Sequence, residues 1–185
     1  MYDVFGLLAA GGSLLLPTES QRREPARWPS LLDRYRVTVW NTVPALLDLL
    51  LDADEQGGAE GSRIAGLRTA LVSGDWIGLD LPARLRARTA RPCSFVAMGG
   101  ATEAAIWSNT LTVTDLDARW VSIPYGRPLT GQHYRVVDRS GRDCPTGRPA
   151  NAHRWCRTGP RLPGRPGPHR REVRRTGRAT LVPDG

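Results

Sequence analysis

The chain has 185 residues and a formal net charge of +8, and 40% of its residues are hydrophobic. This composition excludes a collagen, a coiled coil and a fully disordered chain, and the length suits one domain or part of a larger one. No apolar run reaches the ~18 residues that a membrane helix needs, and the three cysteines include no Cys-x-x-Cys pair, which argues against a disulfide framework and a zinc site.

The charge is concentrated towards the C-terminus. Residues 1–141 contain 15 Arg and 15 acidic residues, whereas residues 142–185 contain 11 Arg and three acidic residues. The second stretch is also rich in Pro and Gly and has neither helical nor strand periodicity. We therefore expect a folded core at residues 1–147 and a disordered basic tail at residues 148–185.

Helical and strand patterns alternate along the core. Helical spacing predicts helices at residues 2–10, 25–36, 43–51 and 81–88. Short apolar or β-branched runs predict strands at residues 13–16, 37–41, 67–73, 94–98 and 134–138. This alternation is typical of β-α-β units, so we expect an α/β fold with a mostly parallel sheet and flanking helices.

Some polar residues have a structural interpretation. The polar stretch at residues 52–62 is predicted to be a loop, and four acidic side chains in or before it are predicted to be solvated: Asp48, Asp52, Asp54 and Glu55. Cys93 has no basic partner near it in sequence and is not expected to be a nucleophile. His133 has no second ligand at metal-binding spacing and is expected to be structural.

The N-terminus has Asp3 and no basic segment, which favours a cytoplasmic protein.

In a sheet of this kind, ligands bind outside the carboxyl ends of the strands. Three predicted strand ends carry polar residues or glycines, around Asn41, Ser73 and Thr102. The third contains a glycine pair, which lets the backbone approach a flat or phosphorylated ligand closely. Thr102 adds a hydroxyl and Glu103 an oxygen that suits Mg²⁺. We expect the three strand ends to converge around one cavity.

Four segments in this order resemble the adenylation domain of nonribosomal peptide synthetases: VTVWNTVPALLDLLL, LRTALVSGDWIGLDLP, FVAMGGATEAAIWSN and SIPYGRPLTGQHYRVVD. The resemblance covers residues 1–147 and implies part of the large N-terminal domain of the adenylate-forming ligases. It also implies a reaction that uses ATP and Mg²⁺ to form an aminoacyl adenylate. The acyl group would then pass to the phosphopantetheine thiol of a peptidyl carrier protein.

The resemblance implies roles for individual nucleotide-site residues. Thr102 would contact the AMP phosphate, and Glu103 would hold the Mg²⁺ ion. Gly74 and Asp75 would flank the adenosine, and the segment Gly99, Gly100 and Ala101 would lie along the adenine. Many family members have an aromatic residue in place of Gly99 and Pro in place of Ala101. The variant found here is typical of the subgroup that is paired with heterocyclisation modules.

The resemblance also implies a set of substrate-pocket residues: Tyr2, Asn41, Leu71, Ser73, Met98, Ile106 and Trp107. This set is similar to the one that selects cysteine. Its apolar, polarisable members suit a thiol, whereas an unpartnered serine hydroxyl would cost about 1–3 kcal/mol. Discrimination on these grounds is about 10²-fold, so serine stays open as an alternative substrate.

The chain contains no Lys, because all 26 of its basic residues are Arg. The family's catalytic Lys therefore has no counterpart here. Its upstream phosphate-binding loop and downstream ribose-binding Asp are missing as well, and no catalytic residue is assigned. Since electrostatic stabilisation of the transferring phosphate usually contributes most to the rate of such chemistry, we expect this chain alone to be inactive.

The tail permits two interpretations. In the first, residues from about 148 onward are out of frame. Permitted codons for residues 169–173, read one base along, spell Thr-Ala-Glu-Arg-Phe, and those for residues 179–185 spell Arg-Arg-Trp-Tyr-Arg-Thr-Gly, both family-like. In the second, its arginines bind nucleic acid, although a single aromatic residue, Trp155, provides no stacking platform. A non-catalytic interaction module is a further alternative.

Overall fold

The computed structural model describes residues 2–57, 61–100, 106–132, 134–137 and 154–157. Its centre is a five-stranded sheet with the strand order β1-β2-β3-β4-β5. The strands are β1 (Val39–Thr42), β2 (Thr69–Ser73), β3 (Ser94–Gly99), β4 (Asn109–Val113) and β5 (Arg127–Pro128). A separate two-stranded antiparallel sheet joins β6 (Tyr134–Val137) to β7 (Arg154–Arg157).

The sheet is mixed, whereas the sequence predicted it to be mostly parallel. β1, β2 and β3 are parallel, but β4 is antiparallel to β3, and β5 is antiparallel to β4. The reason is the short connection between Gly99 and Asn109. A parallel return needs a crossover of about a dozen residues or more, usually with a helix. The predicted α/β class with flanking helices is confirmed.

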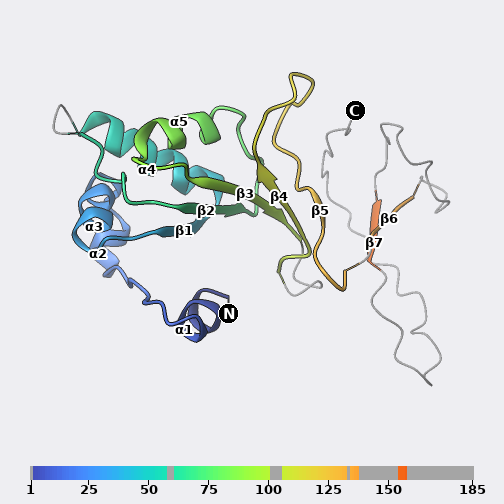
Figure 1. Cartoon of the computed structure of the whole chain (residues 1–185), viewed down its shortest axis with the longest axis horizontal. Coiled ribbons are helices and arrows are strands. Elements are labelled where there is room, and N and C mark those ends of the chain that lie inside the picture. The colour runs from blue at the N-terminus through green and yellow to red at the C-terminus, as the bar shows by residue number, and fades with distance from the viewer. Residues whose placement is uncertain (1, 58–60, 101–105, 133, 138–153, 158–185) are drawn as a thin grey trace.

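Two helices connect the parallel strands and cover one face of the sheet (Figure 1). They are α4 (Pro44–Gln56) and α5 (Leu81–Arg88). Each has Pro in its first turn, where the missing amide proton costs nothing. Their apolar side chains pack with those of the sheet, and Leu47, Leu50, Leu85 and Phe95 are fully buried.

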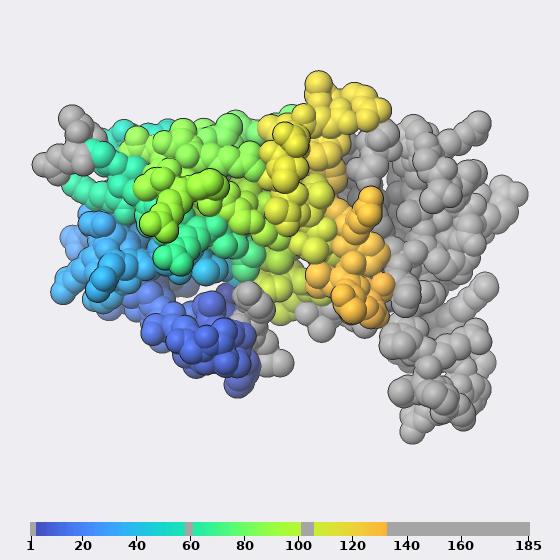
Figure 2. Space-filling view, viewed as in Figure 1, coloured from blue at the N-terminus to red at the C-terminus, as the bar shows by residue number. Residues whose placement is uncertain are grey.

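The N-terminal elements lie on the other side of the sheet or at its margin (Figure 1). They are the π-helix η1 (Tyr2–Gly6), α1 (Leu7–Ala9), α2 (Glu19–Arg22), the 3-10 helix η2 (Pro25–Arg27) and α3 (Trp28–Arg34). In Figure 2 the first residues form a lobe opposite α4 and α5. Phe5 and Leu8 in this lobe are exposed by 66% and 53%, so little of its apolar surface is covered by the described residues.

Several predicted boundaries need correction. Residues 13–16 form no strand, and Leu16 is 76% exposed. Helix α4 continues to Gln56, so residues 52–56 are not a loop. Residues 154–157 form β7, where no regular element was predicted. His133 and most of the tail lie outside the described residues. Among the described helices, none has the length and apolar character needed to cross a bilayer.

Candidate functional site

The alternation of side chains along the strands sorts the predicted pocket residues onto one face of the sheet. Asn41 pairs with Leu71, and Ser73 pairs with Met98. Residues in register on parallel strands point to the same side, as do residues two apart on one strand. These four residues therefore share a face. The intervening residues, such as Val72, point into the core beneath α4 and α5.

A hydrogen bond holds η1 beside this face. The Nδ2 atom of Asn41 donates to Oδ1 of Asp3 at a distance of 2.5 Å. Tyr2 is the first residue of η1, so the segment that carries it lies next to the end of β1. Sequence reasoning missed Asp3 as a partner, because the two residues are 38 positions apart and no local pattern links them.

A second hydrogen bond joins the end of β2 to the segment after β3. The indole Nε1 of Trp107 donates to Oγ of Ser73 over 3.0 Å. Ile106, which precedes it, has a φ of 80° and is 57% exposed. A left-handed conformation is strained for a β-branched residue and costs about 1–3 kcal/mol. The surrounding turn must therefore hold this conformation in place.

Gly100 allows the turn between β3 and Ser108 to close tightly. A Cβ atom at this position would overlap the carbonyl oxygen of Ile106 and lie 2.9 Å from Cα of Trp107. The amide of Ser108 donates to the carbonyl of Gly99 over 2.9 Å and closes the turn. Only a residue without a side chain allows the two backbone segments to approach this closely.

Two of the other predicted nucleotide positions, Gly74 and Gly100, are exposed glycines. Gly74 has a φ of 94°, which favours glycine. The Oδ1 atom of Asp75 accepts a hydrogen bond from the amide of Trp76 over 2.7 Å, which fixes the loop after β2. At the end of β3, Gly99 is buried with the Tyr125 side chain against it, whereas Gly100 is exposed and leaves backbone that a flat ligand could approach. Ala101, Thr102 and Glu103 lie outside the described residues, so their phosphate and Mg²⁺ roles stay predictions.

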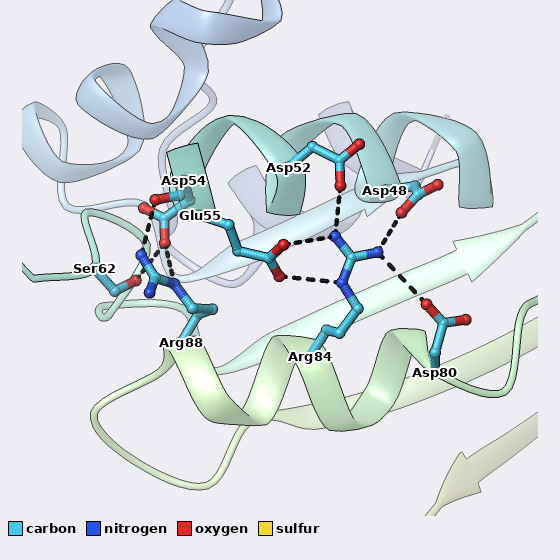
Figure 3. A network of polar contacts seen from close by, with 8 residues as sticks. All are labelled: Asp48, Asp52, Asp54, Glu55, Ser62, Asp80, Arg84 and Arg88. Atoms are coloured by element: carbon cyan, nitrogen blue, oxygen red, sulfur yellow. Dashed lines mark hydrogen bonds and ion pairs between the residues drawn. The ribbon is translucent and has the colours of Figure 1, made fainter. Parts of the chain in front are cut away.

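The acidic residues of α4 form an ion-pair network with α5 (Figure 3). Arg84 contacts Asp48 over 2.5 Å, Asp52 over 2.6 Å and Glu55 over 3.1 Å. The hydrogen bond to Glu55 is the largest cause that raises the pKa of Arg84, and Asp48 and Asp52 add to it. These three carboxylates are 41–51% exposed, as expected of solvated side chains, and they also share one guanidinium, which was not predicted.

Asp54 differs from its neighbours, since only 1% of its side chain is exposed. It accepts hydrogen bonds from Nε of Arg88 over 2.7 Å, from Oγ of Ser62 over 2.8 Å and from the amide of Arg63 over 2.9 Å. These donors satisfy a buried charge that would otherwise be costly. Among the described residues, no group of three His, Cys, Asp or Glu is arranged to hold a metal ion, and we assign this network to stability.

Cys93, which directly precedes β3, is buried, with 4% of its surface exposed. Burial raises the pKa of its thiol to about 11. Cys93 is therefore protonated at neutral pH. Because the thiolate is the reactive form, this cysteine is unsuited to nucleophilic attack.

The family profile described as "AMP-binding enzyme" matches residues 1–151. The chain belongs to the AMP-binding enzyme family. Its sequence corresponds to part of the adenylation domain of nonribosomal peptide synthetases, which confirms the resemblance drawn from the motifs.

Relatives of known name support this assignment. The chain is 50% identical over 145 residues to pyochelin synthetase PchE of Pseudomonas aeruginosa, which covers 78% of this chain and 10% of that protein. It is 51% identical over 146 residues to the anguibactin system regulator of Vibrio anguillarum, covering 78% and 14%. It is 40% identical to phenyloxazoline synthase MbtB of Mycobacterium tuberculosis, covering 77% and 10%. The chain thus spans a small part of each relative.

Similar solved structures agree with this family assignment. The nonribosomal peptide synthetase FmoA3 in its α-methyl-L-serine-AMP-bound form is 42% identical, with a TM-score of 0.75, over 86% of this chain and 17% of FmoA3. The protein PA1221, which contains adenylation and PCP domains, is 24% identical with a TM-score of 0.61, over 77% of this chain and 27% of that one. The second likeness shows the shared fold alone.

Proposed function

We propose that this chain forms part of the amino-acid and nucleotide site of an adenylation domain, which activates an amino acid as its adenylate. The observation that carries the proposal is the Trp107–Ser73 hydrogen bond, because it joins the segment after β3 to the end of β2. It does so on the face that also carries Asn41, Leu71 and Met98. One wall of a substrate pocket is therefore assembled from three neighbouring strands.

We propose cysteine as the substrate, with serine as the alternative. Ser73 accepts the indole proton of Trp107, so its own hydroxyl proton is left to donate to a second partner. Leu71 and Met98 give the same wall an apolar character that favours a thiol over a hydroxyl. The bound α-methyl-L-serine adenylate in FmoA3 supports a small amino acid with a polar β-substituent.

The nucleotide is proposed to lie across the ends of β2 and β3. Gly74 and Asp75 would flank the adenosine, Gly99, Gly100 and Ala101 would run along the base, and Thr102 would donate to the phosphate. Mg²⁺, held by Glu103, would neutralise charge on the phosphates. The acyl group would leave the adenylate for the thiol of a phosphopantetheinylated carrier protein. We place this activity in the cytoplasm.

The chain has no Lys to stabilise the transferring phosphate. We therefore propose that the 185-residue chain binds ligands without turning them over. Isothermal calorimetry should detect cysteine binding, with serine weaker by about 10²-fold. ATP–pyrophosphate exchange should give no signal above a blank. Absence of cysteine, serine and nucleotide binding would contradict the proposed site, and exchange above the blank would contradict the inactivity.

We further propose that residues from about 148 onward are read out of frame. The family match ends at residue 151, close to this boundary. The nucleotide sequence is the test, since an absence of family-like text in the shifted frame would overturn the idea.

A nucleic-acid-binding tail is the competing proposal, and it rests on the 11 Arg in residues 142–185. Filter binding in rising salt distinguishes the two. Non-specific charge binding is lost steeply with salt, whereas retention at about 0.5 M salt would favour a selected function. A non-catalytic interaction module would show neither ligand binding nor nucleic-acid binding.

A further inference from the structure

Tyr125 fills the space beside the glycine pair at the end of β3. A Cβ atom added to Gly99 would lie 2.6 Å from Cγ and 2.9 Å from Cβ of Tyr125. The same position would lie 2.8 Å from Oδ1 of Asn109. These distances are well below van der Waals contact, so a side chain at residue 99 and the observed position of Tyr125 exclude each other. The missing side chain of Gly99 is what lets the Tyr125 ring pack against the end of β3.

The segment that carries Tyr125 is fixed on both sides. Before it, the amide of Ile123 donates to the carbonyl of Ile77 over 3.0 Å. After it, Gly126 has a φ of 83°, and a Cβ atom there would overlap the carbonyl oxygen of Thr110. The backbone around Tyr125 is therefore preorganised, and its side chain is only partly buried. Part of the side chain stays accessible beside the strand end.

Tyr125 also lies near the end of β2. Burial raises the pKa of its phenol, and the negative charge of Asp75 raises it further. The phenol consequently stays protonated at neutral pH and can donate a hydrogen bond. Asp75 and Gly99 are both proposed nucleotide positions, and Tyr125 lies close to each of them.

We propose that Tyr125 is a further nucleotide-binding residue, whose aromatic face stacks on the adenine base beside Gly99 and Gly100. This inference rests on the proposed function and deepens it. Bases stack on aromatic side chains because both have extended π faces, and each such contact contributes substantially to affinity. Glycine at position 99 leaves room for the Tyr125 ring, and this ring supplies the flat apolar surface that glycine lacks.

The test compares AMP and cysteine binding to variants of the 185-residue chain by calorimetry. Tyr125→Leu keeps an apolar side chain but removes the π face, so AMP affinity should fall by about fivefold or more while cysteine affinity stays within about twofold. Tyr125→Phe keeps the ring and should retain AMP affinity. Tyr35→Leu is the matched control, because Tyr35 is 54% exposed and precedes β1 at the other end of the strand.

A swap of the two positions tests the geometry directly. Gly99→Tyr alone should lose AMP binding, because the new side chain collides with Tyr125 and Asn109. Gly99→Tyr combined with Tyr125→Ala and Asn109→Ala, which removes both collisions, should recover it. Unchanged AMP affinity in Tyr125→Leu would show that Tyr125 only fills space and would overturn the inference. If Tyr125→Leu fails to fold, the swap and Tyr125→Phe carry the test. If the unmodified chain binds neither AMP nor cysteine, the proposed function fails instead.

Discussion

The indole nitrogen of Trp107 lies 3.0 Å from the hydroxyl oxygen of Ser73, although 34 residues separate them in the chain. This contact draws the turn after β3 onto the end of β2. Both residues belong to the predicted substrate wall, and the bond fixes the direction of the Ser73 lone pair that accepts it. The bond occupies one lone pair of the Ser73 oxygen and leaves the hydroxyl proton to donate elsewhere.

Trp107→Phe removes this hydrogen bond and keeps an aromatic ring. We expect a loss of about 1 kcal/mol in the free energy of unfolding, because a net hydrogen bond contributes roughly that amount. Urea denaturation followed by circular dichroism measures it. Trp76→Phe is the comparison, since Trp76 is 47% exposed. Equal effects of the two substitutions would contradict a specific role for the Trp107 indole.

Asp54→Ala leaves Arg88 without its main partner in the network that joins α4 to α5. Breaking a buried ion pair costs about 3–5 kcal/mol, which corresponds to a fall of about 6–20 °C in the melting temperature of a chain of this length. Asp52→Ala should cost about 1 kcal/mol or less, because 48% of the Asp52 side chain is exposed. Thermal melts of both variants decide the point, and a smaller effect for Asp54 than for Asp52 would contradict it.

Gly100→Ala should distort the turn after β3. The added methyl group meets the backbone of Ile106 and Trp107, which cannot move aside as a flexible side chain would. We expect about 1–3 kcal/mol of destabilisation together with loss of AMP binding. In Gly66→Ala, by contrast, the nearest atom lies 3.7 Å from the new Cβ, which is ordinary contact. Calorimetry and melts on both variants check this, and normal AMP binding by Gly100→Ala would be inconsistent with it.

Cys93 should resist alkylation by iodoacetamide at pH 8 and react only after the chain is unfolded. Its folded pKa of about 11 lies above the ordinary value of 9.0, so the folded state holds the proton more tightly. The contribution of this thiol to the free energy of unfolding is therefore fully present below about pH 9. It falls by about 2 kcal/mol as the pH rises towards 11. Mass spectrometry of the peptide that contains Cys93 measures the alkylation. In Cys93→Ala this part of the pH dependence should vanish, and its persistence would assign it to other groups.

Local patterns predicted the elements whose periodicity is strong. Helix α5 has the predicted bounds, Leu81–Arg88, because Pro82 marks its first turn and Leu81 and Leu85 share a buried face at helical spacing. β2 and β3 were also predicted to within two residues. The strand at residues 109–113 was not predicted. It follows β3 after a short connection without a helix, so the alternation of helix and strand patterns that indicated the other strands is absent there.

Long-range partners could not be predicted from the sequence. Asp54 looked like a loop residue because Arg88, which satisfies it, comes 34 residues later. Asp3 and Tyr125 were not singled out for the same reason, since their contacts with Asn41 and Gly99 join residues far apart in the chain. The proposed pocket residues were chosen by motif, and strand pairing shows that Asn41, Leu71, Ser73 and Met98 share a face.

One face of the parallel strands packs in the hydrophobic core, and the other face carries predicted pocket residues. Val72 and Ala97 fix the hydrophobic interior, while Ser73 and Met98, each one position along, point the other way. In the proposed site, an exchange at Ser73 would change the lining of the pocket and leave the interior beneath α4 and α5 in place. An exchange at Met98, which is 7% exposed, would change the lining and the local packing together.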